Sequence, residues 1–323
     1  MSKIIVTGAH GYIAGKLIRR LLADGHTVVG LTRKNEKIIN EVGYSEIAVA
    51  DYTNEVLLTR AVSGARVVFH LASRAHQRTN INESIELYHS ANVIPAVKMA
   101  HVCAQLGVGR FVMVSSIGVL GNYTNGIPFS DESIPAPVEP YSVSKAIAEQ
   151  RVTDILRVSS CSYCILRPPL VYGPGCPGNF ANLVKLVLNL PIIPFGGVSE
   201  PRTFIYIEHL LDALIIAATH PEASKRTFVV SDETNTSVSE IIKLAAMIFG
   251  RQRWLVFAVP KIVLHTLSII LGRHTDLKKI LTGLCIDSTG FKLATGWRAK
   301  LQTVDAIAET LKAWPREDFP RIY

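Results

Sequence analysis

Short apolar runs alternate with helical stretches through the first half of the chain, and this rhythm limits the fold more than any other feature. The strand-like runs lie at residues 3–8, 27–32, 46–50, 66–72, 110–116 and 163–167. Helical patterns cover 11–23 and 84–107. Strands that are apolar almost throughout are typical of parallel sheets with helices on both faces. The sequence therefore predicts the α/β class, with a Rossmann-type doubly wound parallel sheet.

A stretch rich in Pro and Gly, 168–179, ends this rhythm and indicates a domain boundary. We expect a Rossmann domain over 1–168, with a returning segment near 203–232. A smaller C-terminal α/β lobe over 169–202 and 233–323 would hold the substrate.

Composition excludes several classes of protein. Apolar residues make up 48% of the chain and charged residues 19%, which is ordinary for a folded protein. The formal charge of +8 suggests anionic partners such as nucleotides, diphosphates or a membrane surface, or else a dispersed excess of surface Lys and Arg. No basic run marks a nucleic-acid groove. A strand beginning at Lys3 leaves no room for a signal peptide, so we expect a cytoplasmic protein whose five cysteines are reduced and bind no metal.

The segment 254–272 is 19 residues long and strongly apolar, which is close to a membrane-spanning length. Pro260, Lys261 and His265 interrupt it, so we do not expect a span. The alternatives are a core helix or a helix lying on the membrane, near a lipid-linked substrate at its inner face.

The turn TGAHGYIAG (7–15) joins the first strand to the first helix. Gly8 and Gly11 there allow a tight turn whose N–H groups reach a pyrophosphate at a helix N-terminus. The second strand ends in Thr32, Arg33 and Lys34, two cations and no carboxylate, which favours NADP(H) and leaves NAD(H) open.

A candidate catalytic group lies in the middle of the chain. Tyr141 and Lys145 are four residues apart in a helical stretch, so both lie on one face. An ammonium nearby would lower the phenol pKa from about 10 and help it exchange protons. Ser116 ends the fifth strand, at the sheet edge where ligands bind, and could hydrogen-bond the same substrate oxygen that Tyr141 protonates.

These features together resemble an extended short-chain dehydrogenase/reductase of the NAD(P)-dependent nucleotide-sugar epimerase/dehydratase family. The resemblance covers nearly the whole chain. It rests on TGAHGYIAG, Asp51, HLAS (70–73), Asn92, VSSIGVLG (114–121), YSVSK (141–145), LRPPLVYGPG (166–175), Arg202 and TGW (295–297).

The resemblance implies roles for particular residues. Ser116, Tyr141 and Lys145 would be catalytic, and Asn92 would brace the helix that carries the lysine. The expected cofactor contacts are Gly8, Gly11, Tyr12, Ile13, Thr32, Arg33, Lys34, Asp51, Tyr52, Leu71, Ala72, Ser73, Asn92, Tyr141, Lys145 and Pro168. The expected substrate contacts are Ser116, Asn179, Arg202 and Arg74, with Arg74 and His76 otherwise solvated loop residues. His70 is interpreted as a satisfied core histidine.

The departures from the family pattern narrow the activity. Ile117 and Gly118 follow Ser116 where sugar 4,6-dehydratases carry Asp-Glu, which argues against dehydration. The chain looks most like bacterial polysaccharide enzymes, both UDP-N-acetylquinovosamine-type 4-reductases and UDP-sugar 4-epimerases. The leading hypothesis is therefore NAD(P)H-dependent reduction of the C4 ketone of a UDP-4-keto-6-deoxy-hexosamine, for lipopolysaccharide or O-antigen.

Two alternatives stay open. One is a UDP-glucose or UDP-N-acetylglucosamine 4-epimerase with bound NAD, and the remote one is a non-catalytic dinucleotide-binding regulator. A homodimer is implied by the resemblance only.

Overall fold

The computed structural model describes residues 2–33, 39–50, 52–74, 85–190, 192–250, 256–260, 263 and 281–315. Its main sheet has seven described strands, all parallel, in the order β3-β2-β1-β4-β5-β6-β9. The strands are β1 (Lys3–Thr7), β2 (Thr27–Thr32), β3 (Tyr44–Ala48), β4 (Val67–His70), β5 (Arg110–Val114), β6 (Ser162–Arg167) and β9 (Arg226–Val229). The predicted Rossmann-type doubly wound sheet is confirmed.

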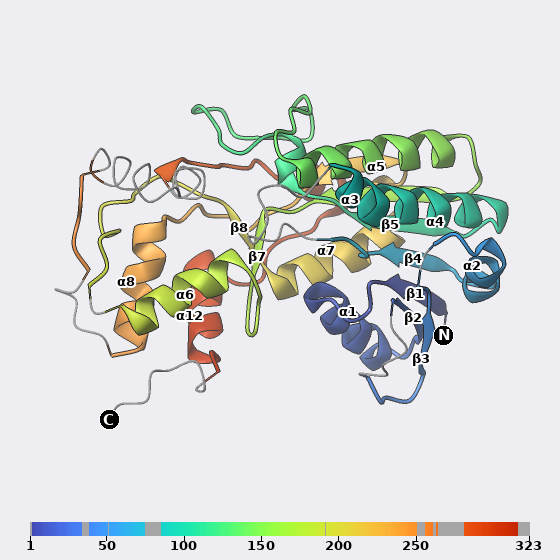
Figure 1. The fold of residues 1–323 in the computed structure, drawn as a ribbon, viewed down its shortest axis with the longest axis horizontal. Coiled ribbons are helices and arrows are strands. Elements are labelled where there is room, and N and C mark those ends of the chain that lie inside the picture. The colour runs from blue at the N-terminus through green and yellow to red at the C-terminus, as the bar shows by residue number, and fades with distance from the viewer. Residues whose placement is uncertain are drawn as a thin grey trace.

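Helices cover both faces of this sheet (Figure 1). One face carries α1 (Tyr12–Ala23) and α7 (Ile207–Thr219), and the other carries α2 (Glu55–Val62), α4 (Ile94–Gln105) and α5 (Pro140–Arg157). Along β1, Ile4 and Val6 pack with the α1 side while Ile5 packs with the opposite side. Because successive strand residues point to opposite faces, a sheet buried on both faces needs strands that are apolar throughout.

The helical pattern over 84–107 is interrupted in the structure. It forms α3 (Ile85–Tyr88), a π-helical turn η1 (His89–Val93) and α4. Pro95 lies in the first turn of α4. Proline lacks the N–H that would bond residue 91, and its ring crowds that carbonyl, which explains why the regular ladder is broken just before it.

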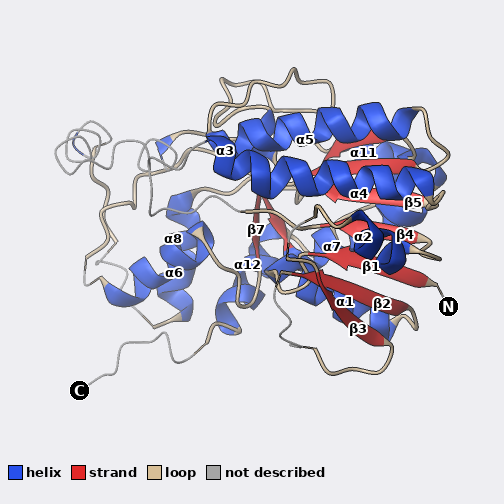
Figure 2. Cartoon of the chain, turned by 45° about the vertical axis from the view of Figure 1, so that its right-hand side comes forward, coloured by secondary structure: helices blue, strands red, loops and turns tan. Residues whose placement is uncertain are grey.

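A smaller α/β part lies at one end of the sheet (Figures 1 and 2). It contains a two-stranded parallel sheet of β7 (Leu170–Tyr172) and β8 (Phe204–Tyr206), with α6 (Asn179–Asn189), α8 (Val238–Ile248) and α12 (Thr303–Lys312). The short elements are η2 (Ile117–Val119), η3 (Pro221–Ala223) and α11 (Thr289–Thr295). Between β8 and α8 the chain returns to the main sheet, where β9 pairs with β6.

A buried polar network joins the two parts. Asp232, just after β9, accepts a hydrogen bond from Tyr172 in β7 (2.7 Å) and lies 2.7 Å from Nδ1 of His209 in α7. The Leu301 N–H donates to Nε2 of His209 at 3.2 Å. Nε2 is therefore the acceptor, so the ring proton sits on Nδ1 and is donated to Asp232.

The apolar segment 254–272 differs from the helix expected there. Val256 and Ala258 form isolated β-bridges with Ile193 and Phe195, so the helix expectation is wrong at these residues. Between them, the Phe257 N–H donates to the Ile193 carbonyl (3.1 Å) and the Phe257 carbonyl accepts from the Gly196 N–H (3.0 Å), so its backbone groups have partners outside a helix. The rest of the segment, apart from 259–260 and 263, lies outside the described residues. Among the helices that are described, none has the length and apolarity to cross a membrane.

Candidate active site

The glycine-rich turn lies between β1 and α1 as predicted. Gly8 has a φ of +68°, and a Cβ there would lie 2.8 Å from the Ala72 Cα, so this position needs glycine. Gly11 is the N-cap of α1, with no side-chain cap and no acidic residue in the first turn. The first N–H groups of α1 therefore have no side-chain acceptor and suit a pyrophosphate.

Thr7 ties the end of β1 to the end of β4. Its Oγ1 accepts hydrogen bonds from the N–H groups of Leu71 (3.1 Å) and Ala72 (3.0 Å), and it lies 3.1 Å from Nδ1 of His70. Burial lowers the pKa of His70 to about 3, so the ring is neutral. Its buried Nε2 has no partner in the described part of the chain, so the interpretation as a satisfied histidine holds for one nitrogen only.

The predicted contacts at the adenosine end of the cofactor are partly described. Tyr52 is buried in the core on the far side of the sheet from α1, and burial raises its pKa to about 12. Ile13 packs against the α1-side core. Arg33 is exposed, whereas Lys34 and Asp51 lie outside the described residues.

Sequence reasoning missed an acidic residue near the end of β2. The Thr32 hydroxyl donates to Oε1 of Glu46, from β3, at 3.2 Å. Glu46 also lies 2.9 Å from Nε2 of His10 and accepts a hydrogen bond from the Tyr44 hydroxyl at 3.0 Å. An acidic residue inside an apolar strand was the available signal.

Tyr12 and Lys16 form a second Tyr-x-x-x-Lys pair, which lies in the glycine-rich turn and helix α1. The Tyr12 hydroxyl donates to the Pro174 carbonyl at 3.3 Å, and the Lys16 Nζ lies 5.6 Å from the centre of the Tyr12 ring. Burial raises the pKa of Tyr12 far above its usual range. This tyrosine links α1 to the turn after β7.

Tyr141 lies in the first turn of α5 and meets two serines. Ser116, which follows β5, and Ser73, which follows β4, lie close enough to the Tyr141 hydroxyl to lower the phenol pKa as hydrogen-bond partners. Burial outweighs both serines and raises this pKa to about 12. The expectation that Lys145 holds this pKa below 10 is therefore wrong for this structure, because the desolvation cost of the phenolate dominates.

Lys145 is buried, with 3% of its surface exposed, and its Nζ donates to the Val114 carbonyl at 2.9 Å. Burial lowers its pKa to about 8, an effect that Glu149 one turn later partly offsets. Glu149 itself pairs with Arg167 through hydrogen bonds of 2.6, 3.0 and 3.2 Å. This ion pair links α5 to β6 one helical turn after the lysine.

Asn92 connects three segments of the site. It lies in the π-helical turn η1 and is 2% exposed. Its Oδ1 accepts hydrogen bonds from the Arg74 N–H (2.7 Å) and the Ser73 hydroxyl (3.1 Å). Its Nδ2 donates to the Ser144 hydroxyl in α5 at 2.9 Å, and that hydroxyl donates to the Tyr141 carbonyl at 2.7 Å. The amide thereby links the loop after β4 to the helix that carries Tyr141 and Lys145.

The expected substrate residues lie on several different segments of the chain. Arg202 is half-buried and its guanidinium donates to the Thr282 carbonyl at 2.7 Å, while Asn179 is exposed at the start of α6. Arg74 is partly buried beside Asn92. Pro168 is buried, and its carbonyl accepts from the Ile117 N–H next to Ser116 (2.9 Å).

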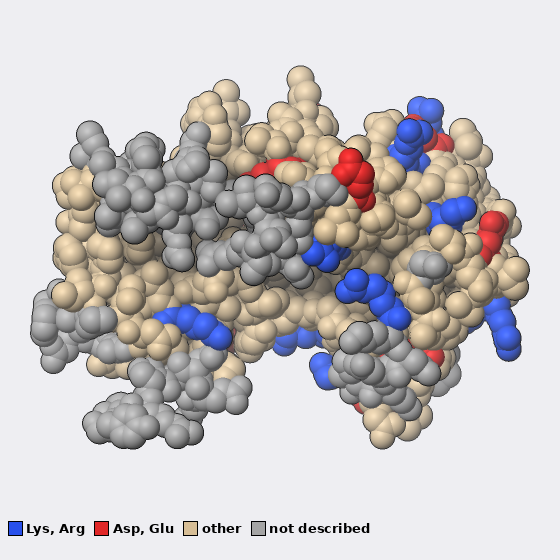
Figure 3. All heavy atoms as spheres, in the orientation of Figure 1, with Lys and Arg blue, Asp and Glu red and all other residues tan. Residues whose placement is uncertain are grey.

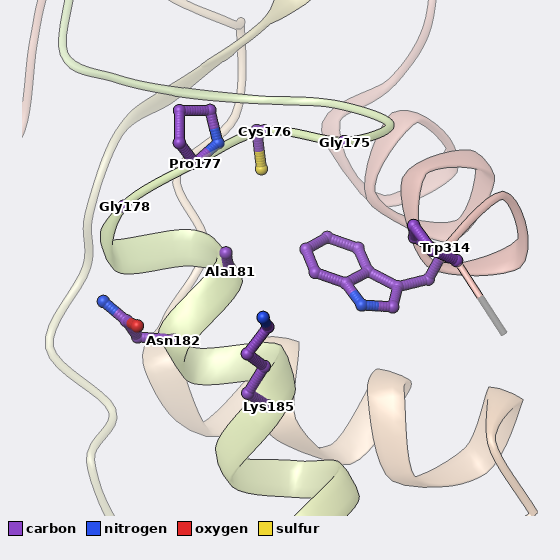
Figure 4. A pocket seen from close by; sticks show the side chains of 9 residues that line it. Gly175, Cys176, Pro177, Gly178, Ala181, Asn182, Lys185 and Trp314 are labelled. Carbon is purple, nitrogen blue, oxygen red and sulfur yellow. The ribbon is translucent and has the colours of Figure 1, made fainter. Parts of the chain in front are cut away.

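A cavity of about 320 Å³ lies beside the first two turns of α6 (Figure 4). Its lining includes Cys176, Asn182, Lys185 and Trp314 but none of the predicted site residues. On the face drawn in Figure 3, the described Lys and Arg side chains are spread rather than gathered in one patch. That face matches the dispersed alternative for the +8 charge.

Comparisons with known proteins identify the family of the chain. The model of the NAD dependent epimerase/dehydratase family matches residues 4–231. The chain is 30% identical to a UDP-glucose 4-epimerase of Vibrio cholerae over 319 residues, which are 96% of this chain and 95% of the relative.

Two solved structures show the same fold. One is a UDP-glucose 4-epimerase of Thermotoga maritima with UDP-glucose (TM-score 0.79, 22% identity, covering 96% of this chain and 98% of that one). The other is a UDP-glucuronic acid 4-epimerase of Bacillus cereus in complex with NAD (TM-score 0.78, 20% identity, with the same coverage). The motifs, the fold and the family match together show that the chain belongs to the NAD dependent epimerase/dehydratase family, the extended short-chain dehydrogenase/reductases.

Proposed function

We propose that the protein is a 4-epimerase of a UDP-sugar that uses NAD. The observation that carries the proposal is the Tyr141 hydroxyl close to Ser116, on the helix that also carries the buried Lys145, at the carboxyl ends of β4 and β5. The carboxyl edge of a doubly wound sheet is where such folds bind their ligands. The relative from Vibrio cholerae, similar over almost its whole length, supports the same activity.

The residues of the turn fit a dinucleotide. Gly8 lets the chain pass close to Ala72, and the first turn of α1 offers N–H groups to a pyrophosphate. The Lys145 ammonium would hold a hydroxyl of the nicotinamide ribose, as the family resemblance implies. When bound, NAD supplies the acceptor and donor of hydride at C4.

The side chains handle the proton and the oxygen. Tyr141 takes the proton of the C4 hydroxyl as the C4–H bond breaks, and returns it when the alcohol re-forms on the other face. Because burial holds the phenol pKa near 12, the resting phenol is protonated at neutral pH and must lose this proton before it can take the one from the C4 hydroxyl. A cation near the phenolate makes this ionisation easier. Ser116 hydrogen-bonds the same oxygen and steadies the charge that develops on it.

Reduction of the C4 ketone of a UDP-4-keto-6-deoxy-hexosamine with NADPH is the second candidate. It would use the same three residues, with Tyr141 only donating a proton. The observation that favours it is the end of β2, where Thr32 and the exposed Arg33 take the place of a carboxylate. Surface polysaccharide synthesis would be the destination of either product.

The deciding experiment follows UDP-N-acetylglucosamine and UDP-glucose by NMR with the purified protein and NAD. Conversion to the galacto epimer without net NADH formation supports the epimerase. Stoichiometric loss of NADPH with a UDP-4-keto-6-deoxy-hexosamine, and no epimer, would make the protein a reductase. Tyr141→Phe should lower either rate by about 10²- to 10⁴-fold. Tyr163→Phe, which removes a phenol hydroxyl from β6 outside the site, is the control and should leave the rate unchanged.

A further inference from the structure

We infer that Glu46, on the edge strand β3, selects the cofactor by favouring the free adenosine ribose of NAD(H) over the 2′-phosphate of NADP(H). This inference rests on the proposed function, because it assumes that a nicotinamide dinucleotide occupies the glycine-rich turn. The cations at the end of β2 favoured the phosphorylated cofactor, so the two expectations differ in a way that a binding measurement can decide.

The register of the strands brings Glu46 to the correct face. Glu46 pairs with Gly30 of β2, and Ala48 pairs with Thr32. Residues paired in a parallel sheet point to the same side, and Tyr44 from that side packs in the core that contains α1. Glu46 therefore projects toward the glycine-rich turn rather than away from it. In Figure 2, β3 lies at the edge of the sheet beside β2.

Gly30 makes room for this arrangement. A Cβ at Gly30 would lie 2.8 Å from the Cβ of Ala9 and 2.9 Å from Cζ of Tyr44. Any larger residue would displace the Tyr44 ring, whose hydroxyl holds Oε2 of Glu46 at 3.0 Å. The glycine in the middle of a buried strand thus has a packing reason.

The carboxylate lies where a ribose-binding acid is needed. In dinucleotide-binding folds an acidic side chain near the end of the second strand accepts the ribose hydroxyls. Here Thr32 holds that end, but its hydroxyl donates to Glu46 at 3.2 Å, so β3 supplies the charge from the adjacent strand. His10, in the turn itself, holds the same oxygen at 2.9 Å.

The charge of Glu46 would oppose a phosphate. Its side chain is only 5% exposed, so water screens it poorly. Tyr44 and Thr32 are neutral donors, and neither cancels the negative charge. Arg33, which directly follows Thr32, is exposed, and water screens the charge of an exposed guanidinium strongly. A ribose hydroxyl can donate to a carboxylate, whereas a 2′-phosphate beside it meets a like charge.

The test measures cofactor affinity without sugar, by titration calorimetry of the full chain after charcoal removal of nucleotide. The wild-type protein should bind NAD⁺ at least about tenfold more tightly than NADP⁺. Glu46→Gln, which keeps the shape and removes the charge, should narrow this ratio about tenfold, mainly through tighter NADP⁺ binding. Glu41→Gln is the matched control, an exposed carboxylate five residues earlier that pairs with Arg19 at 3.6 Å. It should leave the ratio unchanged.

His10→Arg provides a second variant if Glu46→Gln does not fold, since His10 is at the surface of the turn. A guanidinium there would neutralise Glu46 and should also narrow the ratio. A wild-type preference for NADP⁺, or an unchanged ratio in the variants, would overturn the inference. Equal weakening of both cofactors in Glu46→Gln would do the same, because it is the mark of a structural role. Failure of the proposed function is seen separately, as cofactor binding with no conversion of the sugar, or as no binding of either cofactor.

Discussion

Replacement of Lys145 by Met should make the protein more stable at pH 7 while removing its activity. The pKa of this buried lysine is about 8, against an ordinary value of 10.5. The difference of about 2.5 corresponds to about 3 kcal/mol of unfavourable burial of the ammonium, at about 1.4 kcal/mol for each pKa unit. Losing the hydrogen bond to the Val114 carbonyl costs about 1 kcal/mol. The net gain is about 2 kcal/mol, or roughly 3 °C in Tm for a chain of this size.

The pH dependence gives this prediction its sharpest form. Below pH 8 the folded wild-type protein carries the full cost of a buried ammonium, and the cost disappears as pH rises from about 8 to 10.5, because the folded state loses its proton first. The Met variant lacks this titration, so its advantage should shrink over that interval. Thermal unfolding of both proteins at pH 7, 8.5 and 10 measures it, with exposed Lys312→Met as the control. A variant less stable than wild type at pH 7, or an advantage that stays constant with pH, would refute the reasoning.

Two further substitutions test the packing below the site, each by thermal unfolding. Glu149→Gln should cost about 3–5 kcal/mol because it leaves the buried Arg167 guanidinium without its charge partner, and a loss below about 1 kcal/mol would contradict this role. Gly8→Ala should destabilise the protein more than Gly25→Ala. Both glycines have positive φ, but only at Gly8 would the new Cβ meet the Ala72 backbone, at 2.8 Å, whereas at Gly25 it would meet open space. Equal losses for the two variants would show that the approach to Ala72 does not matter.

The main sheet could be predicted from the sequence because its strands are buried on both faces. The run Thr27–Thr32 is apolar between its terminal threonines, and its bounds in the structure match the prediction, whereas β3 begins and ends two residues earlier than expected. The pair β7 and β8 gave no comparable signal, since each has three residues and follows a proline-rich turn or a loop. Likewise the pattern of 84–107 is helical on average, and only the position of Pro95 hints that a π-helical turn precedes it.

Some features of the site depend on residues close in the sequence, and these could be predicted, whereas others depend on contacts between distant residues. The glycine-rich turn and the Tyr141–Lys145 spacing are local, so the sequence shows them directly. The position of Glu46 beside Thr32 depends on the pairing of β3 with β2, and 14 residues separate the two in the chain. The raised pKa of Tyr141 depends on how deeply α5 is covered, which spacing alone does not report.

The return of the chain to β9 means that neither half of this protein is a separable fragment. A chain cut after Arg167 would lose β9, leaving the edge of β6 without its hydrogen-bonding neighbour. It would also lose α7, whose Leu210, Leu211 and Leu214 are buried in the core on the α1 face. Unpaired edges and bare apolar faces invite aggregation. Exchange of the smaller α/β part between relatives therefore calls for two inserted segments, spliced on either side of the α7–β9 return, rather than one fusion point.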